Sequence, residues 1–258
     1  VEAYDLYLQG RFLWSQRTGE ALMKAIALFE RAIQRDHRYA GAYAALAEAY
    51  VVLPPYAAYS PREAYSKATT AARAALALDS TLSGARASLG NIRLAERNWA
   101  GAESEFQHAI RLNPAEVSAR SWYAILLGRV LKRDDEAMRE LRHAAQLDPL
   151  SRTNQTDLAL MLYFQHRYDE AVAELRQVLE LDPGFAAAHQ LLGRIYTRLG
   201  RHTEAVSELE RSAGISQRQI ARGWLACAYA AAGDRSRAAA IVEDFERQAK
   251  VEYVSPFA

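Results

Sequence analysis

The sequence predicts an all-α repeat protein, and three observations support that prediction. The 258-residue chain is 50% hydrophobic but has only 13 glycines and 7 prolines, a composition that favours helices. A nine-residue pattern ending in Asn-Pro or Asp-Pro closes at Pro114, Pro149 and Pro183, so successive copies lie 35 and 34 residues apart. Each copy contains two amphipathic stretches, which predicts two short helices per copy.

The period divides the chain into seven expected units that form a single solenoid. Their boundaries are 3–39, 40–82, 83–116, 117–151, 152–185, 186–218 and 219–250, followed by the start of a further helix in 251–258. A helix of about 14 residues cannot bury its apolar face alone, so we expect neighbouring units to stack.

Small residues recur at matched points, where they would let the two helices of a unit approach closely. In the first helices they are Gly10, Ala47, Gly90, Ala124, Ala159, Gly193 and Ala226. In the second helices they are Ala25, Ala68, Ala102, Ala137, Ala171, Ala205 and Ala238.

The second unit carries about nine extra residues around 53–59, which we expect to lengthen a turn without breaking the following helix. Ser60-Pro61-Arg62-Glu63 predicts an N-cap, a first-turn proline and the glutamate of a capping box. We therefore expect a helix from Pro61 to Leu78.

The pattern resembles the tetratricopeptide repeat, a helix–turn–helix unit of 34 residues. The resemblance covers about residues 4–250. It implies a right-handed superhelix whose first helices line a concave face, acting as a non-enzymatic protein-interaction module. In one known use of this repeat, Lys and Asn at set points capture a C-terminal carboxylate. Those points hold Tyr7, Arg11, Glu48, Ala87 and Asn91 here, and we do not expect that use because Glu48 would repel a carboxylate.

Composition and motifs exclude several other function classes. Thirty-two basic residues balance 31 acidic ones, so there is no electrostatic reason to expect nucleic acid or a membrane surface as partner. No P-loop, nucleophile elbow, HExxH or paired CxxC motif occurs, and we expect no catalysis, cofactor or metal. The lone Cys227 lies among alanines and is expected to pack as a small side chain.

The expected partner is a protein or peptide bound on the concave face. Residues four, seven and eight apart on each first helix share one face. A basic patch of arginines around Tyr163-Phe164 would suit a peptide with acidic and apolar side chains. The alternative is that these rings pack within the array and the arginines are ordinary solvated positions. The predicted contact residues are Arg11, Trp14, Glu48, Asn91, Ile125, Arg129, Leu160, Tyr163, Phe164, Arg194, Thr197 and Arg198.

A narrower resemblance concerns the opening segment from Ala3 to Trp14, followed by Arg17-Thr18. It looks like the lead-in to the repeat regions of certain bacterial signalling proteins, in which the repeats follow a winged-helix, adenylate-cyclase or kinase module. Ser255-Pro256 reads as the start of another helix, so we expect the sequence to be a piece of a longer protein. Two other readings stay open: a groove that senses a small molecule, and self-association through the uncapped ends.

Overall fold

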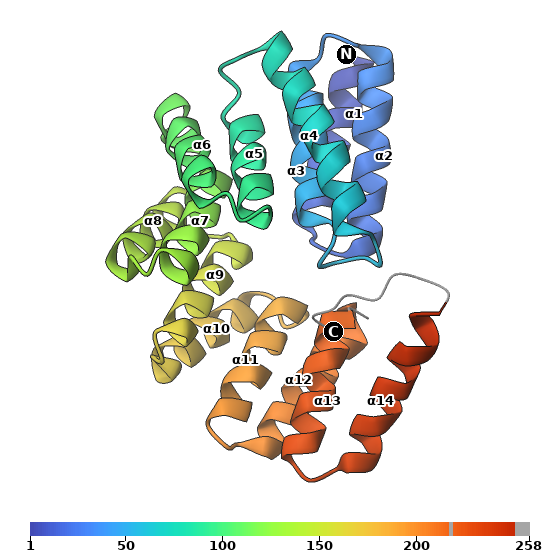
Figure 1. The fold of residues 1–258 in the computed structure, drawn as a ribbon, viewed down its shortest axis with the longest axis vertical. Coiled ribbons are helices and arrows are strands. Elements are labelled where there is room, and N and C mark those ends of the chain that lie inside the picture. Colours follow the sequence, from blue (N-terminus) through green and yellow to red (C-terminus); the bar gives the residue numbers. More distant parts are fainter. Residues whose placement is uncertain (217–218, 251–258) are drawn as a thin grey trace. The chain divides into compact units, whose positions relative to one another are not determined.

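The computed structural model describes residues 1–216 and 219–250, and within these ranges every regular element is a helix. Fourteen α-helices follow one another as seven helix–turn–helix pairs (Figure 1), which confirms the predicted all-α repeat fold. The end of the predicted unit 186–218, at 217–218, and the predicted helix start in 251–258 lie outside the described residues.

First and second helices alternate along the chain. The first helices are α1 (Glu2–Ser15), α3 (Ala40–Val52), α5 (Ser83–Ala95), α7 (Val117–Ile125), α9 (Arg152–Phe164), α11 (Ala186–Arg198) and α13 (Gln219–Ala231). The second helices are α2 (Gly19–Arg35), α4 (Pro61–Leu78), α6 (Trp99–Leu112), α8 (Asp134–Leu147), α10 (Tyr168–Leu181), α12 (His202–Ser216) and α14 (Arg235–Gln248).

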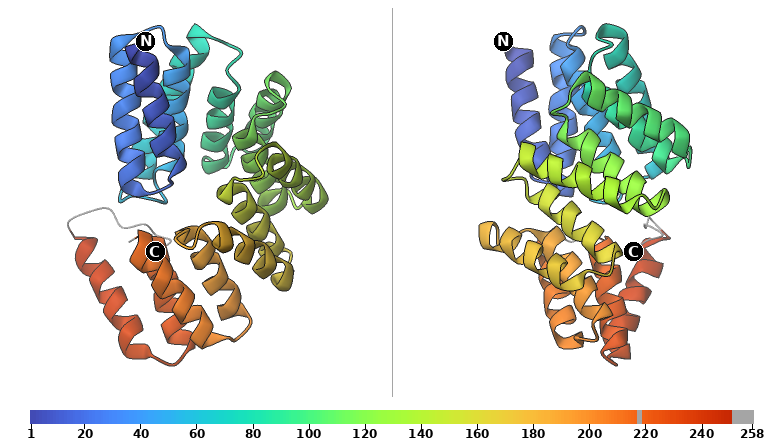
Figure 2. Two further views of the ribbon diagram at one scale, coloured as in Figure 1. Left: turned by 180° about the vertical axis from the view of Figure 1, so that it is seen from behind. Right: turned by 90° about the vertical axis from the view of Figure 1, so that its left-hand side faces the viewer.

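The chain divides into two compact units. The N-terminal unit, Val1–Asp148, contains α1 to α8, and the C-terminal unit, Pro149–Ala258, contains α9 to α14. Within each unit, consecutive helices pack antiparallel as neighbours, which two further views make visible (Figure 2). The two units are described separately below.

The small residues mark the points of closest helix approach. A Cβ atom added to Gly10 would lie 2.4 Å from the Phe29 ring, and one added to Gly193 would lie 2.4 Å from Leu209 Cγ. Six of the seven predicted small residues of the second helices, all except Ala238, are fully buried. The large apolar side chains therefore fill the space that the small ones leave open.

The insertion in the second pair keeps the predicted helix but not its predicted cap. Helix α4 runs from Pro61 to Leu78, as expected. The capping box is wrong, because the Ser60 side chain makes no capping hydrogen bond. The Glu63 carboxylate instead accepts a hydrogen bond from the Tyr59 hydroxyl at 2.8 Å and pairs with Lys67 at 2.9 Å, so it does not reach back to the helix end.

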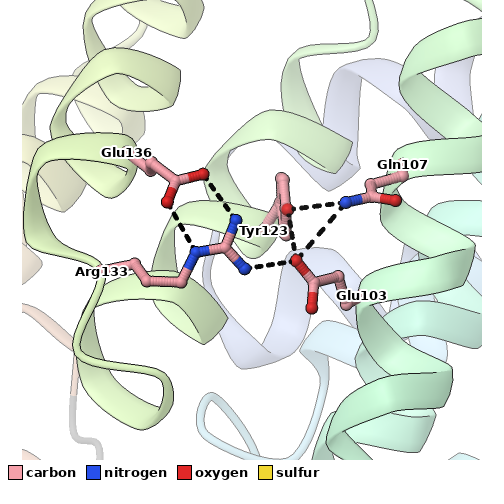
Figure 3. A network of polar contacts seen from close by, with 5 residues as sticks. All are labelled: Glu103, Gln107, Tyr123, Arg133 and Glu136. Atoms are coloured by element: carbon pink, nitrogen blue, oxygen red, sulfur yellow. Dashed lines mark hydrogen bonds and ion pairs between the residues drawn. The ribbon is translucent and has the colours of Figure 1, made fainter.

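In the N-terminal unit a polar network joins three consecutive helices (Figure 3). The Arg133 guanidinium donates to Glu103 on α6 and to Glu136 on α8, each at 2.6 Å. The Tyr123 hydroxyl on α7 donates to the same Glu103 at 2.8 Å, and the Gln107 amide donates to the Tyr123 oxygen at 3.1 Å. Helix α7 continues beyond this network as a short π-helix, η1 (Leu126–Val130).

A membrane-spanning helix would need a long apolar stretch. None of the helices in residues 1–216 and 219–250 combines the length and hydropathy that crossing a bilayer requires.

Candidate protein-binding face

The first-helix face of the N-terminal unit is organised around one ion pair. Arg11 on α1 donates to Glu48 on α3 at 2.6 Å, and the Glu48 side chain is only 8% exposed. The Arg11 guanidinium carbon also lies 4.5 Å from the centre of the Trp14 ring, and that of Arg17 lies 3.7 Å from it. Trp14 and Glu48, two predicted contact residues, therefore belong to the packing of this unit.

A second carboxylate lies close to this pair. Glu116 accepts a hydrogen bond from the Ser83 hydroxyl at 2.6 Å. Burial raises the pKa of the Glu116 carboxyl, and the nearby Glu48 charge raises it further. The Glu48 carboxylate raises the pKa of the Arg11 guanidinium in turn. Arg11 is thus already engaged by a carboxylate, and the region around it carries excess negative charge.

The remaining predicted residues of this unit lie further along the same series of helices. Asn91 on α5 and Ile125 at the end of α7 are half-buried, and Arg129 is exposed on η1. Because Arg129 belongs to the N-terminal unit, the structure gives it no defined place beside the aromatic residues of α9.

In the C-terminal unit an arginine is held by aromatic rings. The Arg194 guanidinium carbon on α11 lies 4.9 Å from the centre of the Tyr163 ring on α9 and 4.5 Å from that of Trp224 on α13. The Arg198 Nε donates to the Tyr163 hydroxyl at 3.3 Å. Phe164 packs edge-on against Tyr163 with ring centres 5.4 Å apart. We call these five residues the Arg194 cluster.

The inner part of the Arg194 cluster is buried, and its outer part is exposed to solvent. Tyr163 is 6% exposed, whereas Phe164 is 38% exposed and Arg198 is exposed to solvent. Hydrogen bonding to the Tyr163 hydroxyl raises the pKa of Arg198. The predicted neighbours Leu160 and Thr197 are half-buried, and the Thr197 hydroxyl donates to the Gly193 carbonyl at 2.8 Å.

Among the described residues of the C-terminal unit, Arg198 differs from most other arginines because it forms no ion pair with a carboxylate. Arg152 pairs with Asp182 at 2.8 Å, and Arg222 pairs with Asp244 at 2.5 Å. Across the described residues, no ion pair within 4.0 Å joins Arg198 to an acidic side chain. The exposed end of the cluster is therefore cationic.

Sequence reasoning found four members of the cluster and missed Trp224. The predicted contact residues include none on α13, so Trp224 was missed. Its position in the repeat could have drawn attention to it. Trp224 lies two residues before the small Ala226, just as Trp122 lies two residues before the small Ala124. The expectation for Cys227 is wrong, because its side chain is exposed. It directly follows the small residue of its helix, and this is the position of Arg11 and Arg194.

The described residues were also searched for side chains that could bind a metal ion. Within residues 1–216 and 219–250, no group of three or more His, Cys, Asp and Glu side chains is placed to hold a metal ion.

Comparison with known proteins supports the same repeat. Residues 162–220 match the family model of the tetratricopeptide repeat, and no curated protein matches the sequence. Among solved structures, a tetratricopeptide repeat protein from Parabacteroides merdae has 13% identity and a TM-score of 0.61, covering 94% of this chain and 91% of that one.

Two further structures have the same fold. PilF of Pseudomonas aeruginosa has 19% identity and a TM-score of 0.58, covering 85% of this chain and 95% of that one. The APC/C hetero-tetramer Cut9-Hcn1 contains a chain with 17% identity and a TM-score of 0.62, covering 88% of this chain and 46% of that one. The chain is therefore an all-α protein with the tetratricopeptide-repeat fold, and residues 162–220 match the family's own sequence model.

Proposed function

We propose that the chain is a non-enzymatic protein-interaction module that binds a peptide or protein segment on the first-helix face of its C-terminal unit. The observation that carries this proposal is the placement of Arg194 between Tyr163 and Trp224, with Arg198 beside them and free of any carboxylate ion pair in the described structure. The bound segment needs no cofactor or metal, and its chemistry follows from the cluster.

The cluster favours an acidic side chain flanked by an apolar one. A guanidinium stacked on aromatic rings keeps its charge, and the exposed Arg198 guanidinium beside the rings can meet a carboxylate. Charge-assisted hydrogen bonds to carboxylates are about twice as strong as neutral ones. The exposed Phe164 ring beside Tyr163 offers an apolar contact next to this charge.

Preorganisation strengthens the case for binding. Arginine loses considerable side-chain entropy when a partner immobilises it. In this protein the rings of Tyr163 and Trp224 already restrict Arg194, so less entropy remains to be lost on binding. The fold is also compatible with partner binding, since one protein that has it is part of a hetero-tetramer.

The wider role we propose is that of the regulatory part of a larger bacterial signalling or transcription protein. The support is the resemblance of the segment from Ala3 to Trp14 to the lead-in of such repeat regions. The full-length reading frame tests this directly. A DNA-binding, cyclase or kinase module next to this segment supports the role, and a reading frame with no such module contradicts it.

A random-peptide display selection against the purified chain tests the binding proposal. We expect enrichment of peptides that place Asp or Glu next to an aromatic or aliphatic residue. The Arg194→Glu/Arg198→Glu variant should retain less than about a tenth of the wild-type binding to these peptides, because each carboxylate then meets a like charge.

The matched control is Arg176→Glu/Arg235→Glu, which makes the same charge change at two exposed positions on second helices. It should bind like the wild type. Failure to enrich any peptide, or equal losses in both variants, would contradict the proposed function.

A further inference from the structure

One polar side chain of the C-terminal unit is buried without a hydrogen bond to the rest of the described structure. Gln190 on α11 is only 8% exposed. No residue in 1–216 or 219–250 donates a hydrogen bond to its amide or accepts one from it. Neither its amide oxygen nor its amide nitrogen is sealed from solvent, so both atoms can be reached from outside.

Other side chains buried to a similar degree have their hydrogen bonds within the protein, as buried polar groups generally do. The Ser212 hydroxyl donates to the Ala186 carbonyl at 2.9 Å, and the neighbouring His189 contacts Glu208 at 2.6 Å. The same holds for Ser83, Ser88, Glu105 and Arg120. Gln190 differs from them, because any group that pairs with its amide has to come from outside the described residues.

Gln190 lies on the same side of α11 as the Arg194 cluster. It precedes Arg194 by four residues, about one helical turn, so the two side chains leave the same side of the helix. At the same position of the neighbouring first helices, the Thr156 hydroxyl already donates to the Arg152 carbonyl at 2.7 Å, and Gly223 has no side chain. The Gln190 amide therefore adjoins the cluster along the first-helix face.

The chemistry of the amide indicates what it can bind. A glutamine amide has one acceptor oxygen and two N–H donors. A carboxylate would use only the donors, and an ammonium group would use only the oxygen. The N–H and C=O of a peptide main chain use both. In a helix these main-chain groups are already paired with each other, so only an extended segment presents them.

We propose that Gln190 binds the main chain of a partner segment that is extended where it crosses α11. This inference rests on the proposed function, since the acidic side chain of the same segment meets Arg198. Gln190 and Arg198 are eight residues apart, a rise of about 12 Å along the helix. An extended peptide covers this length in about four residues. The residue held by Gln190 therefore lies within about four residues of the acidic one.

Main-chain substitution in a display-selected acidic peptide tests this inference. In a series of synthetic peptides, one amide at a time is replaced by an ester, which removes a single N–H donor and keeps every side chain. Affinity for the wild-type 258-residue chain should fall about three- to tenfold for an ester within about four residues of the acidic residue.

Gln190→Leu supplies the matching change in the protein. It should weaken binding of the all-amide peptide by a similar factor, and the sensitive ester should then cost nothing further, because both changes remove the same hydrogen bond. Leucine is of similar size and needs no partner, so we expect an unchanged urea midpoint. The control Gln177→Leu makes the same change at an exposed position of α10 and should bind like the wild type.

The outcomes separate this inference from the proposed function. A Gln190→Leu variant that binds like the wild type, or equal ester losses in the two proteins, overturns the role of Gln190. The ester series on the wild type needs no variant, and a series without a sensitive position overturns it as well. If only Arg194→Glu/Arg198→Glu loses the peptide, the proposed function stands and the role of Gln190 falls. A chain that enriches no peptide contradicts both.

Discussion

A Gly-Arg dipeptide occurs at the same position of the repeat in both units, and the two arginines make different contacts. Gly10-Arg11 lies on α1 and Gly193-Arg194 lies on α11, with each arginine directly after the small residue of its first helix. Arg11 is paired with a buried carboxylate, whereas Arg194 is stacked between two rings. The repeat fixes where the arginine lies, and its neighbours decide which groups it contacts.

The difference originates in the following first helix. The residue after the small residue of α3 is Glu48, which takes the Arg11 charge. The corresponding residue of α13 is the uncharged Cys227, and Arg194 stacks on Tyr163 and Trp224. The N-terminal pair is therefore an ion pair between two first helices, whereas the C-terminal cluster ends in the exposed Arg198, where we propose that a partner binds.

Removal of Arg11 should give the largest loss of stability. Arg11→Ala leaves the Glu48 carboxylate buried without its cation, and breaking a buried pair in this way costs about 3 kcal/mol. Urea unfolding measures the loss. The double variant Arg11→Ala/Glu48→Gln should recover part of it, because the buried charge is gone. If Arg11→Ala were no more destabilising than Arg194→Ala, the distinction between the two regions would fail.

A pH titration should separate the units through another matched position, six residues after a closing proline. In the N-terminal unit, Arg120 donates to the Pro114 carbonyl at 2.9 Å and to Glu140 at 2.5 Å. In the C-terminal unit, His189 makes the equivalent contacts, to the Pro183 carbonyl at 2.9 Å and to Glu208 at 2.6 Å. A histidine can donate to both oxygens only when it is protonated.

Hydrogen bonding to Glu208 raises the pKa of His189 above its usual 6.5, against the opposing effect of burial. A raised pKa means that the folded state binds the proton more tightly than the unfolded state. The stabilisation is thus complete below about pH 6.5 and is lost as pH rises through the folded-state pKa. Unfolding of the wild type at pH 6 and pH 8 should show lower stability at pH 8. His189→Arg should be less sensitive over this window, and an unchanged slope would contradict the assignment.

Arg194→Ala should cost less stability than Arg11→Ala. The variant removes the contacts of one guanidinium with two rings, worth about 1 kcal/mol. Thermal unfolding measures this loss, and display-selected acidic peptides measure the accompanying loss of binding. A variant that unfolds like the wild type but has lost binding supports the distinction between Arg11 and Arg194. One that is destabilised yet binds normally refutes it.

Tyr163→Phe should have the smallest effect. It removes the hydroxyl that positions Arg198 but keeps the ring under Arg194, so we expect about 0.5 kcal/mol in stability and a few-fold weaker peptide binding. Isothermal titration with a selected peptide measures the change. Tyr229→Phe is a matched control, since its hydroxyl donates to Glu210 outside the cluster, and it should bind normally.

The period of the sequence accounts for most of the fold. The recurring spacing of small and large residues predicted the helix pairs, including α4 from Pro61 to Leu78 despite the insertion before it. The Ser60 cap could not be predicted in the same way. Tyr59 and Lys67 compete for the Glu63 carboxylate, and that competition depends on side-chain placement.

The sequence predicted part of the site, a group of arginines around Tyr163-Phe164. Helical spacing placed Tyr163 with Phe164 and Arg194 with Arg198, and the structure brings the two pairs together. Contacts between helices depend on how successive first helices are staggered, which the period does not specify. Trp224 and the Arg11–Glu48 pair both result from that stagger.

The most direct test of the central claim is the affinity of one selected acidic peptide for three proteins at neutral pH and 0.15 M salt. These are the wild type, Arg194→Ala/Arg198→Ala and Arg11→Ala/Glu48→Gln. We predict at least about a tenfold loss for the C-terminal variant, since charge-assisted contacts of this kind are worth about 1.5–3 kcal/mol, and an affinity close to that of the wild type for the N-terminal one. Equal losses, or a larger loss for the N-terminal variant, would contradict the account.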